Sequence, residues 1–400
     1  MGTAPPFQVP GFRAAGVACG IKPSGALDLA LIASDVPASA AAVFTRSTVV
    51  GAPVQLSRQR VRSGRARAVV VNSGCSNVAM GERGRRDALA MTAAAAERLD
   101  APERQVLVAS TGVIGEPLPM TRVRRGVRAA ADALRPGGFG DAARAILTTD
   151  TVPKHASARF RIGRREVTVA GIAKGVGMIE PDMATMLAFL VSDAAATPAF
   201  LRKALREACG QSFNRLTVDG EGSTSDTVVL LAGGAAGNPP LAGPRSPGAR
   251  RFAEALAAVS GDLARQLARD GEGATKLVDV RVTGARSHRD AERAARRIAN
   301  SMLVKTALFG GDPNWGRILQ TVGAGRVPLR LARTRVRLGG VLVFRDGASA
   351  GPAARRRAER ALRGSEVSIE VDLGLGRGRA QLWTCDLSYD YVKINAEYTT

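Results

Sequence analysis

One threonine stands where a glycine-bearing loop meets an apolar run. The stretch "KGVGMIEPDMATMLAFLVSDA" begins at Lys174; its first half has the glycines and proline of a loop, and from Met186 on it resembles a buried strand. Thr185 lies at the junction. By composition alone it is an ordinary strand start, because β-branched residues favour strands. The chemical alternative is that the amide between Ala184 and Thr185 is cut, which would leave a hydroxyl and a free α-amine on one residue.

Such a residue would carry its own base. A free α-amine titrates near ~7.7–8, so at neutral pH it can take the proton of a neighbouring hydroxyl. The chain has only 2 histidines, His155 and His288, which disfavours Ser-His-Asp and Cys-His mechanisms. The glycines ahead of Thr185 would let the loop bend until the hydroxyl reaches the Ala184 carbonyl. Thr185 is therefore the candidate nucleophile.

A second stretch could stabilise the negative charge that such an attack creates. "VLVASTGVIGEPLPM" (106–120) reads as an apolar strand that ends in Ser110, Thr111 and Gly112. Backbone amides and a hydroxyl at the end of a buried strand can converge on a developing oxyanion. Taken alone, the stretch is equally an ordinary strand-to-loop turn. It indicates an oxyanion hole only if a nucleophile lies close to it in the fold.

Further polar stretches lie beside apolar strands and suit a pocket for a small molecule, although each is also compatible with turn chemistry. They are "VVVNSGCSNVAMGERG", "ILTTDTVPK", "FNRLTVDGEGSTSDTVVLLA", "RDGEGATK" and "FGGDPNWGR". None matches a phosphate-binding loop, and "GVGMIEP" lacks the third glycine of a dinucleotide fingerprint, so we expect no nucleotide cofactor. The 4 cysteines are far apart and form no C-x-x-C pair, so neither a metal site nor a disulfide framework is expected.

The excess of basic residues raises the question of nucleic-acid binding. The net charge of +22 arises from 57 Lys and Arg against 35 Asp and Glu, and basic clusters such as "RVRSGRARA" could neutralise nucleic-acid phosphates. Aromatic residues make up only 4% of the chain, and no nucleic-acid-binding motif is present, so we expect no nucleic-acid partner. A non-catalytic nucleic-acid binder stays as the alternative from another class. The positive field would also attract anionic small substrates.

No membrane segment or targeting signal is expected. The apolar runs are shorter than the ~18 residues that a spanning helix requires. The N-terminal stretch has no basic start followed by an apolar run, so we expect a cytoplasmic protein.

These candidates need elements to position them, and the pattern predicts an α+β chain. The long loop 233–250 is rich in Gly and Pro, and a boundary near residue 280 divides the expected domains into 1–280 and 281–400. Strands are expected at 67–72, 105–110, 166–173, 185–193, 227–233, 276–284, 367–376 and 380–388. Helices are expected at 85–99, 121–135, 251–270 and 289–308.

Many long motifs, in one order, give the chain a resemblance to a known family. It resembles the bifunctional arginine-biosynthesis acetyltransferases, that is, ornithine acetyltransferase or glutamate N-acetyltransferase, of the N-terminal-nucleophile type. The motifs that carry the resemblance cover nearly the whole chain: "GVACGIKPSGALDLALI", "VVVNSGCSN", "STGVIG", "TTDTVPK", "AKGVGMIEPDMATML", "FNRLTVDGEGSTSDT", "DGEGATK", "DPNWGR" and "WTCDLSYDYVKINAEYTT".

The resemblance implies a fold, a processing step and a set of site residues. The fold would be a layered α/β sandwich with a smaller C-terminal αβ domain. Self-cleavage between Ala184 and Thr185 would give an α chain, 1–184, and a β chain, 185–400, that stay associated as an α2β2 assembly. Thr111 and Gly112 match the family's oxyanion hole. The positions that match its substrate-binding residues are Thr148, Lys174, Thr185, Glu272, Asn395 and Thr400.

The resemblance also implies a reaction. The Thr185 hydroxyl would accept the acetyl group of N-acetylornithine and pass it to glutamate, in a ping-pong exchange without a cofactor; whether acetyl-CoA is a second donor stays open. From charge, Lys174 suits a substrate carboxylate and Glu272 the ornithine ammonium. The alternatives are an aminopeptidase or amidase with the same nucleophile, and an acetyltransferase of a specialised pathway with another acceptor.

Overall fold

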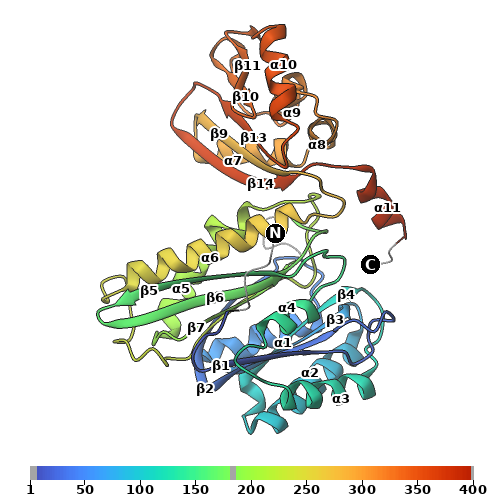
Figure 1. Cartoon of the computed structure of the whole chain (residues 1–400), viewed down its shortest axis with the longest axis vertical. Helices are drawn as coiled ribbons and strands as arrows, with labels where there is room; N and C mark the ends of the chain where they lie inside the picture. The colour runs from blue at the N-terminus through green and yellow to red at the C-terminus, as the bar shows by residue number, and fades with distance from the viewer. Residues whose placement is uncertain (1–6, 181–185, 398–400) are drawn as a thin grey trace. The chain divides into compact units, whose positions relative to one another are not determined.

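The computed structural model describes residues 7–180 and 186–397, which form two units (Figure 1). The first unit contains the residues up to Asn214 together with Gly222–Leu263. The second contains Arg215–Glu221 and the chain from Ala264 on. The boundary expected near residue 280 falls inside a strand of the second unit. The long helix α6, Ala249–Arg269, starts in the first unit and ends in the second.

The first unit is built on an eight-stranded sheet in the order β4-β3-β2-β8-β7-β6-β5, with β1 paired to β2. The strands are β1 (Phe12–Val17), β2 (Leu29–Phe44), β3 (Arg65–Cys75), β4 (Val106–Val113), β5 (Lys154–Ile162), β6 (Arg165–Lys174), β7 (Leu187–Ser192) and β8 (Thr227–Ala232). The helices are α1 (Ala52–Arg60), α2 (Gly81–Leu99), α3 (Met120–Asp132), α4 (Phe139–Ala145), α5 (Pro198–Gln211) and most of α6.

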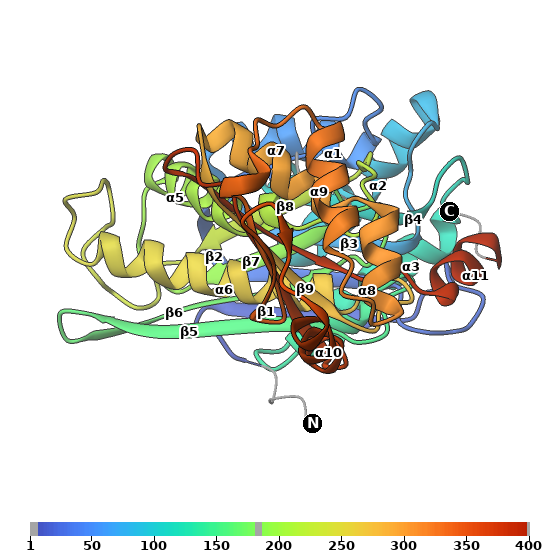
Figure 2. The same ribbon diagram turned by 90° about the horizontal axis from the view of Figure 1, so that it is seen from above.

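Strand β2 joins two halves of this sheet. Its first part pairs with β1 and β3, and its last part, Ser39–Phe44, pairs with β8. The register with β3 shifts between Ala33 and Ala38, where Pro37 cannot donate to a ladder. Beyond β8, the strands β5 and β6 form a long antiparallel ribbon (Figure 2).

The buried side chains show the layers. One core cluster combines residues from both halves of the sheet with Phe139 of α4. A second lies between β1–β4 and the helices α2 and α3, around Met91 and Val127. Phe252 of α6 contacts Phe160 of β5 and Phe200 of α5. The predicted layered α/β sandwich is therefore confirmed.

The second unit carries a six-stranded sheet in the order β12-β11-β10-β13-β9-β14. Its core lies between this sheet and helices such as α7, with Val280 and Ile298 fully buried. The strands are β9 (Leu277–Ala285), β10 (Arg335–Leu338), β11 (Val341–Arg345), β12 (Ala348–Ser349), β13 (Glu366–Asp372) and β14 (Gly378–Cys385). The helices are α7 (His288–Ala299), α8 (Met302–Phe309), α9 (Trp315–Ala324), α10 (Pro352–Ala361) and α11 (Tyr389–Glu397).

One predicted element is wrong. The single helix expected at 289–308 is two helices, α7 and α8, that break at Asn300 and Ser301. Ser301 caps α8 by accepting a hydrogen bond from the Val304 amide at 3.4 Å. A serine that offers its oxygen to a free helix amide begins a new helix rather than continuing the old one. Over residues 7–180 and 186–397, no helix is both long enough and apolar enough to cross a bilayer.

Candidate active site

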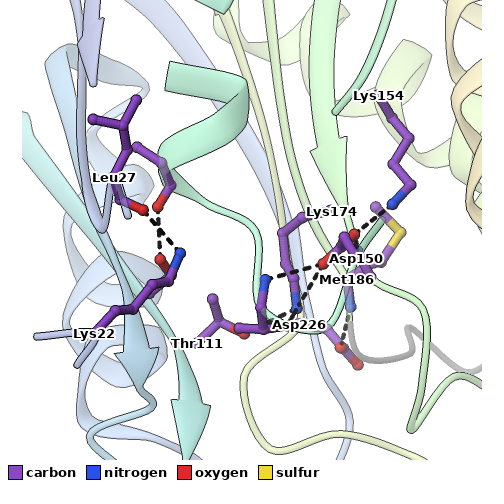
Figure 3. Close-up of polar contacts among 12 residues, drawn as sticks. Lys22, Leu27, Thr111, Asp150, Lys154, Lys174, Met186 and Asp226 are labelled. Carbon is purple, nitrogen blue, oxygen red and sulfur yellow. Dashed lines mark hydrogen bonds and ion pairs between the residues drawn. The ribbon is translucent and has the colours of Figure 1, made fainter. Parts of the chain in front are cut away.

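Three segments distant in sequence meet around one ammonium group. Lys174 is the last residue of β6, Thr111 lies near the end of β4, and Thr148 lies in the loop after α4. The Lys174 Nζ donates to Thr148 Oγ1 at 2.8 Å and to Thr111 Oγ1 at 3.2 Å (Figure 3). Thr111 and Lys174 are buried. The structure thus brings together three of the residues that the sequence singled out in separate motifs.

Gly112, beside Thr111, occupies a position that only glycine fits. Its φ is +128°, and in the β3–β4 ladder it lies opposite Gly74. A Cβ on Gly112 would stand 2.3 Å from the Gly74 carbonyl carbon. The two strands therefore approach closely where β4 ends, and this is the place proposed for oxyanion stabilisation.

A buried carboxylate beneath Lys174 anchors the cluster. The side chain of Asp150 is 0% exposed and accepts from Lys154 Nζ at 2.5 Å, while Lys174 Nζ lies 3.9 Å from it. The amides of Gly175 and Thr148 donate to it at 2.8 Å and 3.1 Å. Burial alone raises the pKa of Asp150, but the charges of Lys174 and Lys154 outweigh burial and lower it to about 2. Among the described residues, the Asp150 carboxylate thus faces two lysine ammonium groups.

The strand that follows the predicted nucleophile is held by a second buried acid. The Met186 amide donates to Asp226 Oδ1 at 2.9 Å, and the Thr227 amide donates to the Met186 carbonyl at 3.1 Å. Asp226 is 1% exposed, and within the described part of the chain its Oδ2 has no hydrogen-bond partner. Burial raises the pKa of Asp226 well above its ordinary value. The predicted cleavage residues Ala184 and Thr185 lie outside the described residues, whereas Met186, covalently next, is fixed in place.

Two further predicted site residues, Glu272 and Asn395, belong to the second unit. Asn395 on α11 donates from Nδ2 to Glu272 Oε2 at 2.9 Å. On the same helix, Tyr391 places its hydroxyl 3.5 Å from Asp219 Oδ2, and burial together with the Asp219 charge raises the pKa of that hydroxyl. Thr400 lies outside the described residues. Glu272 and Asn395, predicted from motifs more than a hundred residues apart, are hydrogen-bonded to each other.

Sequence reasoning missed Asp150, Lys154 and Asp226. All three stand in stretches that the sequence marked as polar, "ILTTDTVPK" and "STSDT", but nothing there gave them a role. The spacing of four residues between Asp150 and Lys154 permits an ion pair, and it was the one sign of their role in the sequence. Complete burial of both side chains shows that the pair belongs to the interior of the site.

The four cysteines are free thiols. Across the described ranges, His, Cys, Asp and Glu form no cluster of three that could hold a metal ion.

Comparisons with known proteins cover nearly all of the chain and agree with one another. The model of the ArgJ family matches residues 13–400. The arginine biosynthesis bifunctional protein ArgJ of Geobacter sulfurreducens is 51% identical over 394 residues, which cover 98% of this chain and 100% of that protein. The protein of the same name from Symbiobacterium thermophilum is 52% identical over 394 residues, with 98% and 97% covered. The crystal structure of the ArgJ protein from Bacillus halodurans is 41% identical, covers 52% of this chain and 98% of its own, and has a TM-score of 0.50.

Proposed function

Because the chain belongs to the ArgJ family, its activity is that of an acetyltransferase of arginine biosynthesis, and we propose that Thr185 is the residue that carries the acetyl group. The overall reaction moves acetyl from N-acetylornithine to glutamate. One observation best supports acetyl transfer at this site. The Lys174 ammonium donates hydrogen bonds to both Thr111 and Thr148, beside the start of β7.

In the first half-reaction, the α-amine of Thr185 takes the proton of its own hydroxyl, and Oγ1 attacks the acetyl carbonyl carbon of N-acetylornithine. Thr111 and Gly112 stabilise the oxyanion that forms. The C–N bond then breaks, the proton passes from the Thr185 ammonium to the leaving nitrogen, and ornithine departs. Thr185 is left as an acetyl ester.

In the second half-reaction, the amine of glutamate attacks the ester carbonyl carbon through the same oxyanion hole. The C–O bond breaks, Oγ1 regains a proton from the attacking amine through the α-amine, and N-acetylglutamate leaves. One amide is exchanged for another, so the exchange needs no external energy source. Lys174 and Thr148 are proposed to hold a substrate carboxylate, and Glu272, Asn395 and Thr400 are proposed as further substrate-binding residues.

The nucleophile is proposed to arise by self-cleavage between Ala184 and Thr185. The Bacillus halodurans chain, nearly all of which aligns to about half of this one, is the length that a cut precursor would give. We propose that the two fragments, 1–184 and 185–400, stay associated as an α2β2 assembly and work in the cytoplasm.

The test is replacement of the nucleophile. Thr185→Ala should give one uncut chain without acetyl transfer. Thr306→Ala, which removes a hydroxyl from the exposed face of helix α8, should be cut and active. Intact mass, followed by N-terminal sequencing of the smaller species, measures the cleavage. Two fragments of normal size from Thr185→Ala would contradict the assignment. Acetate release by the wild type when glutamate is omitted would favour the amidase alternative instead.

A further inference from the structure

A second lysine packs against β3, one of the two strands at the proposed oxyanion hole, and the mechanism above does not use it. Lys22 follows β1 in a loop whose shape is fixed by one buried acid, Asp28. The Asp28 carboxylate accepts hydrogen bonds from four consecutive amides: Cys19 at 2.7 Å, Gly20 at 3.0 Å, Ile21 at 2.6 Å and Lys22 at 3.1 Å. Four charge-assisted bonds to one carboxylate hold this loop in a single conformation.

The stem of Lys22 packs against the strands at the oxyanion position. A Cβ added to Gly74 would stand 3.3 Å from Lys22 Cγ, so the lysine stem covers Gly74 directly. Gly74 in turn pairs with Gly112 across the β3–β4 ladder, and its neighbour Ser73 pairs with Thr111. Lys22 therefore reaches the oxyanion strand from the β3 side.

The Lys22 ammonium has a neutral hydrogen-bond acceptor, since Nζ donates to the Leu27 carbonyl at 2.8 Å. Partial burial lowers the pKa of Lys22; the charge of Asp28 opposes this, the charge of Lys174 adds to it, and Asp150 opposes it. Both carboxylates are already occupied, Asp28 by amides and Asp150 by Lys154 and Gly175. In the view of Figure 3, Thr111 is drawn between Lys22 and Lys174.

Lys174 contacts Thr111, and the stem of Lys22 packs over Gly74 on the paired strand. Two cations near the proposed oxyanion hole match the charge of one substrate and not of the other. Glutamate has two carboxylates, whereas N-acetylornithine has one carboxylate and a cationic side chain. Lys174 accounts for the carboxylate common to both. A second cation on a fixed loop favours the substrate that carries a second anion and disfavours one that carries an ammonium there.

We propose that Lys22 binds the side-chain carboxylate of the glutamate acceptor and so makes the second half-reaction specific for an acidic amino acid. This inference rests on the proposed function, because it assigns the acceptor of that same site. It makes Lys22 a specificity-determining residue for the acceptor, and the first half-reaction does not require it.

The two half-reactions provide the test. Lys22→Gln removes the charge at similar length, Lys22→Arg keeps it, and Lys203→Gln, on an exposed face of α5, is the matched control. For each protein we would measure the rate of Thr185 acetylation by N-acetylornithine alone, by intact mass, and then kcat/KM for glutamate and for glutamine as acceptors. Lys22→Gln should acetylate Thr185 at least as fast as the wild type, because no repulsion of the donor ammonium remains. It should lose at least about tenfold in kcat/KM for glutamate, and lose its preference for glutamate over glutamine by a similar factor.

The other possible results separate a wrong role for Lys22 from a wrong function for the protein. An unchanged kcat/KM for glutamate in Lys22→Gln, with acetylation intact, overturns the role of Lys22 alone. Equal losses for donor and acceptor also overturn it, because they place Lys22 on the carboxylate that both substrates share. Failure of the wild type to form acetyl-Thr185 contradicts the proposed function, and the inference with it. Lys22→Arg should keep most of the preference for glutamate, which separates charge from loop structure.

Discussion

At the scale of single residues, the Thr111 hydroxyl is a hydrogen-bond acceptor for a cation. Its oxygen accepts from the Lys174 ammonium at 3.2 Å, so the ammonium uses a lone pair and leaves the O–H to donate elsewhere. A hydroxyl polarised by a neighbouring cation is a better donor to a developing oxyanion than a free one. The geometry therefore agrees with the role proposed for Thr111.

Replacement of that hydroxyl should slow the chemistry more than it weakens binding. Thr111→Val keeps the shape and removes the donor, so kcat should fall about 10²–10³-fold while KM for glutamate changes little. Thr111→Ser, which retains a hydroxyl, should keep most of the activity. Steady-state kinetics of the two variants provide the comparison. A rise in KM with unchanged kcat would mean that Thr111 binds the ground state and is not an oxyanion donor.

At the scale of elements, the start of β7 is held by a group that is costly to ionise. Asp226 fixes the Met186 amide at 2.9 Å, directly after the proposed cleavage point. Since burial raises its pKa in the folded protein, folding favours the protonated carboxyl. The folded state then binds the proton more tightly than the unfolded chain does, and its stability falls as pH rises from the unfolded pKa, near ~3.9, through the folded pKa.

Asp226→Asn should remove this pH dependence. The amide oxygen can still accept from Met186, so the variant should gain stability relative to the wild type as pH rises from about 4 to 7, by on the order of 1 kcal/mol or more. Urea unfolding of both proteins across this range measures the difference in free energy of unfolding. A difference that stays constant with pH would show that Asp226 titrates alike in the folded and unfolded chains.

At the scale of the whole molecule, the sheet order explains how a cut chain could stay together. Cleavage before Thr185 would place β2 and β6 in one fragment and β7 and β8 in the other. Each junction is a complete antiparallel ladder: β6 with β7 over 6 residue pairs, and β2 with β8 over 6. The core cluster shared by the two halves adds buried residues from both fragments, such as Val71 and Phe189.

The fragments should therefore behave as one particle in native buffer. Size-exclusion chromatography should elute 1–184 and 185–400 together, and they should separate only in denaturant, because separation would expose two rows of ladder hydrogen-bonding groups and the shared core. Separate peaks for the two fragments under native conditions would contradict this. The uncut Thr185→Ala chain, run beside the wild type, marks the position of the intact fold.

The sequence predicted the strands that lie beside the site with only small changes at their ends. The expected strands at 105–110, 166–173 and 227–233 are β4, β6 and β8, because continuous apolar runs of that length favour buried strands. It did not predict β2, whose Ala- and Ser-rich stretch from Leu29 to Phe44 has no clear alternation. That missed strand is the one that connects the two halves of the sheet.

The chain by itself determined which chemical groups are available: a threonine at a loop-to-strand junction, a Ser-Thr-Gly strand end and a chain with 2 histidines. The tertiary structure alone decided which of them meet. Lys174 and Thr111 are 63 residues apart and lie on strands from the two halves of the sheet, β6 and β4, which share one core cluster. Asp150 became a buried anchor for two lysines only when the surrounding layers removed water from all three side chains. Periodicity and turn residues act over a few positions along the chain, whereas contact, burial and charge pairing depend on segments that only the folded sheet brings together.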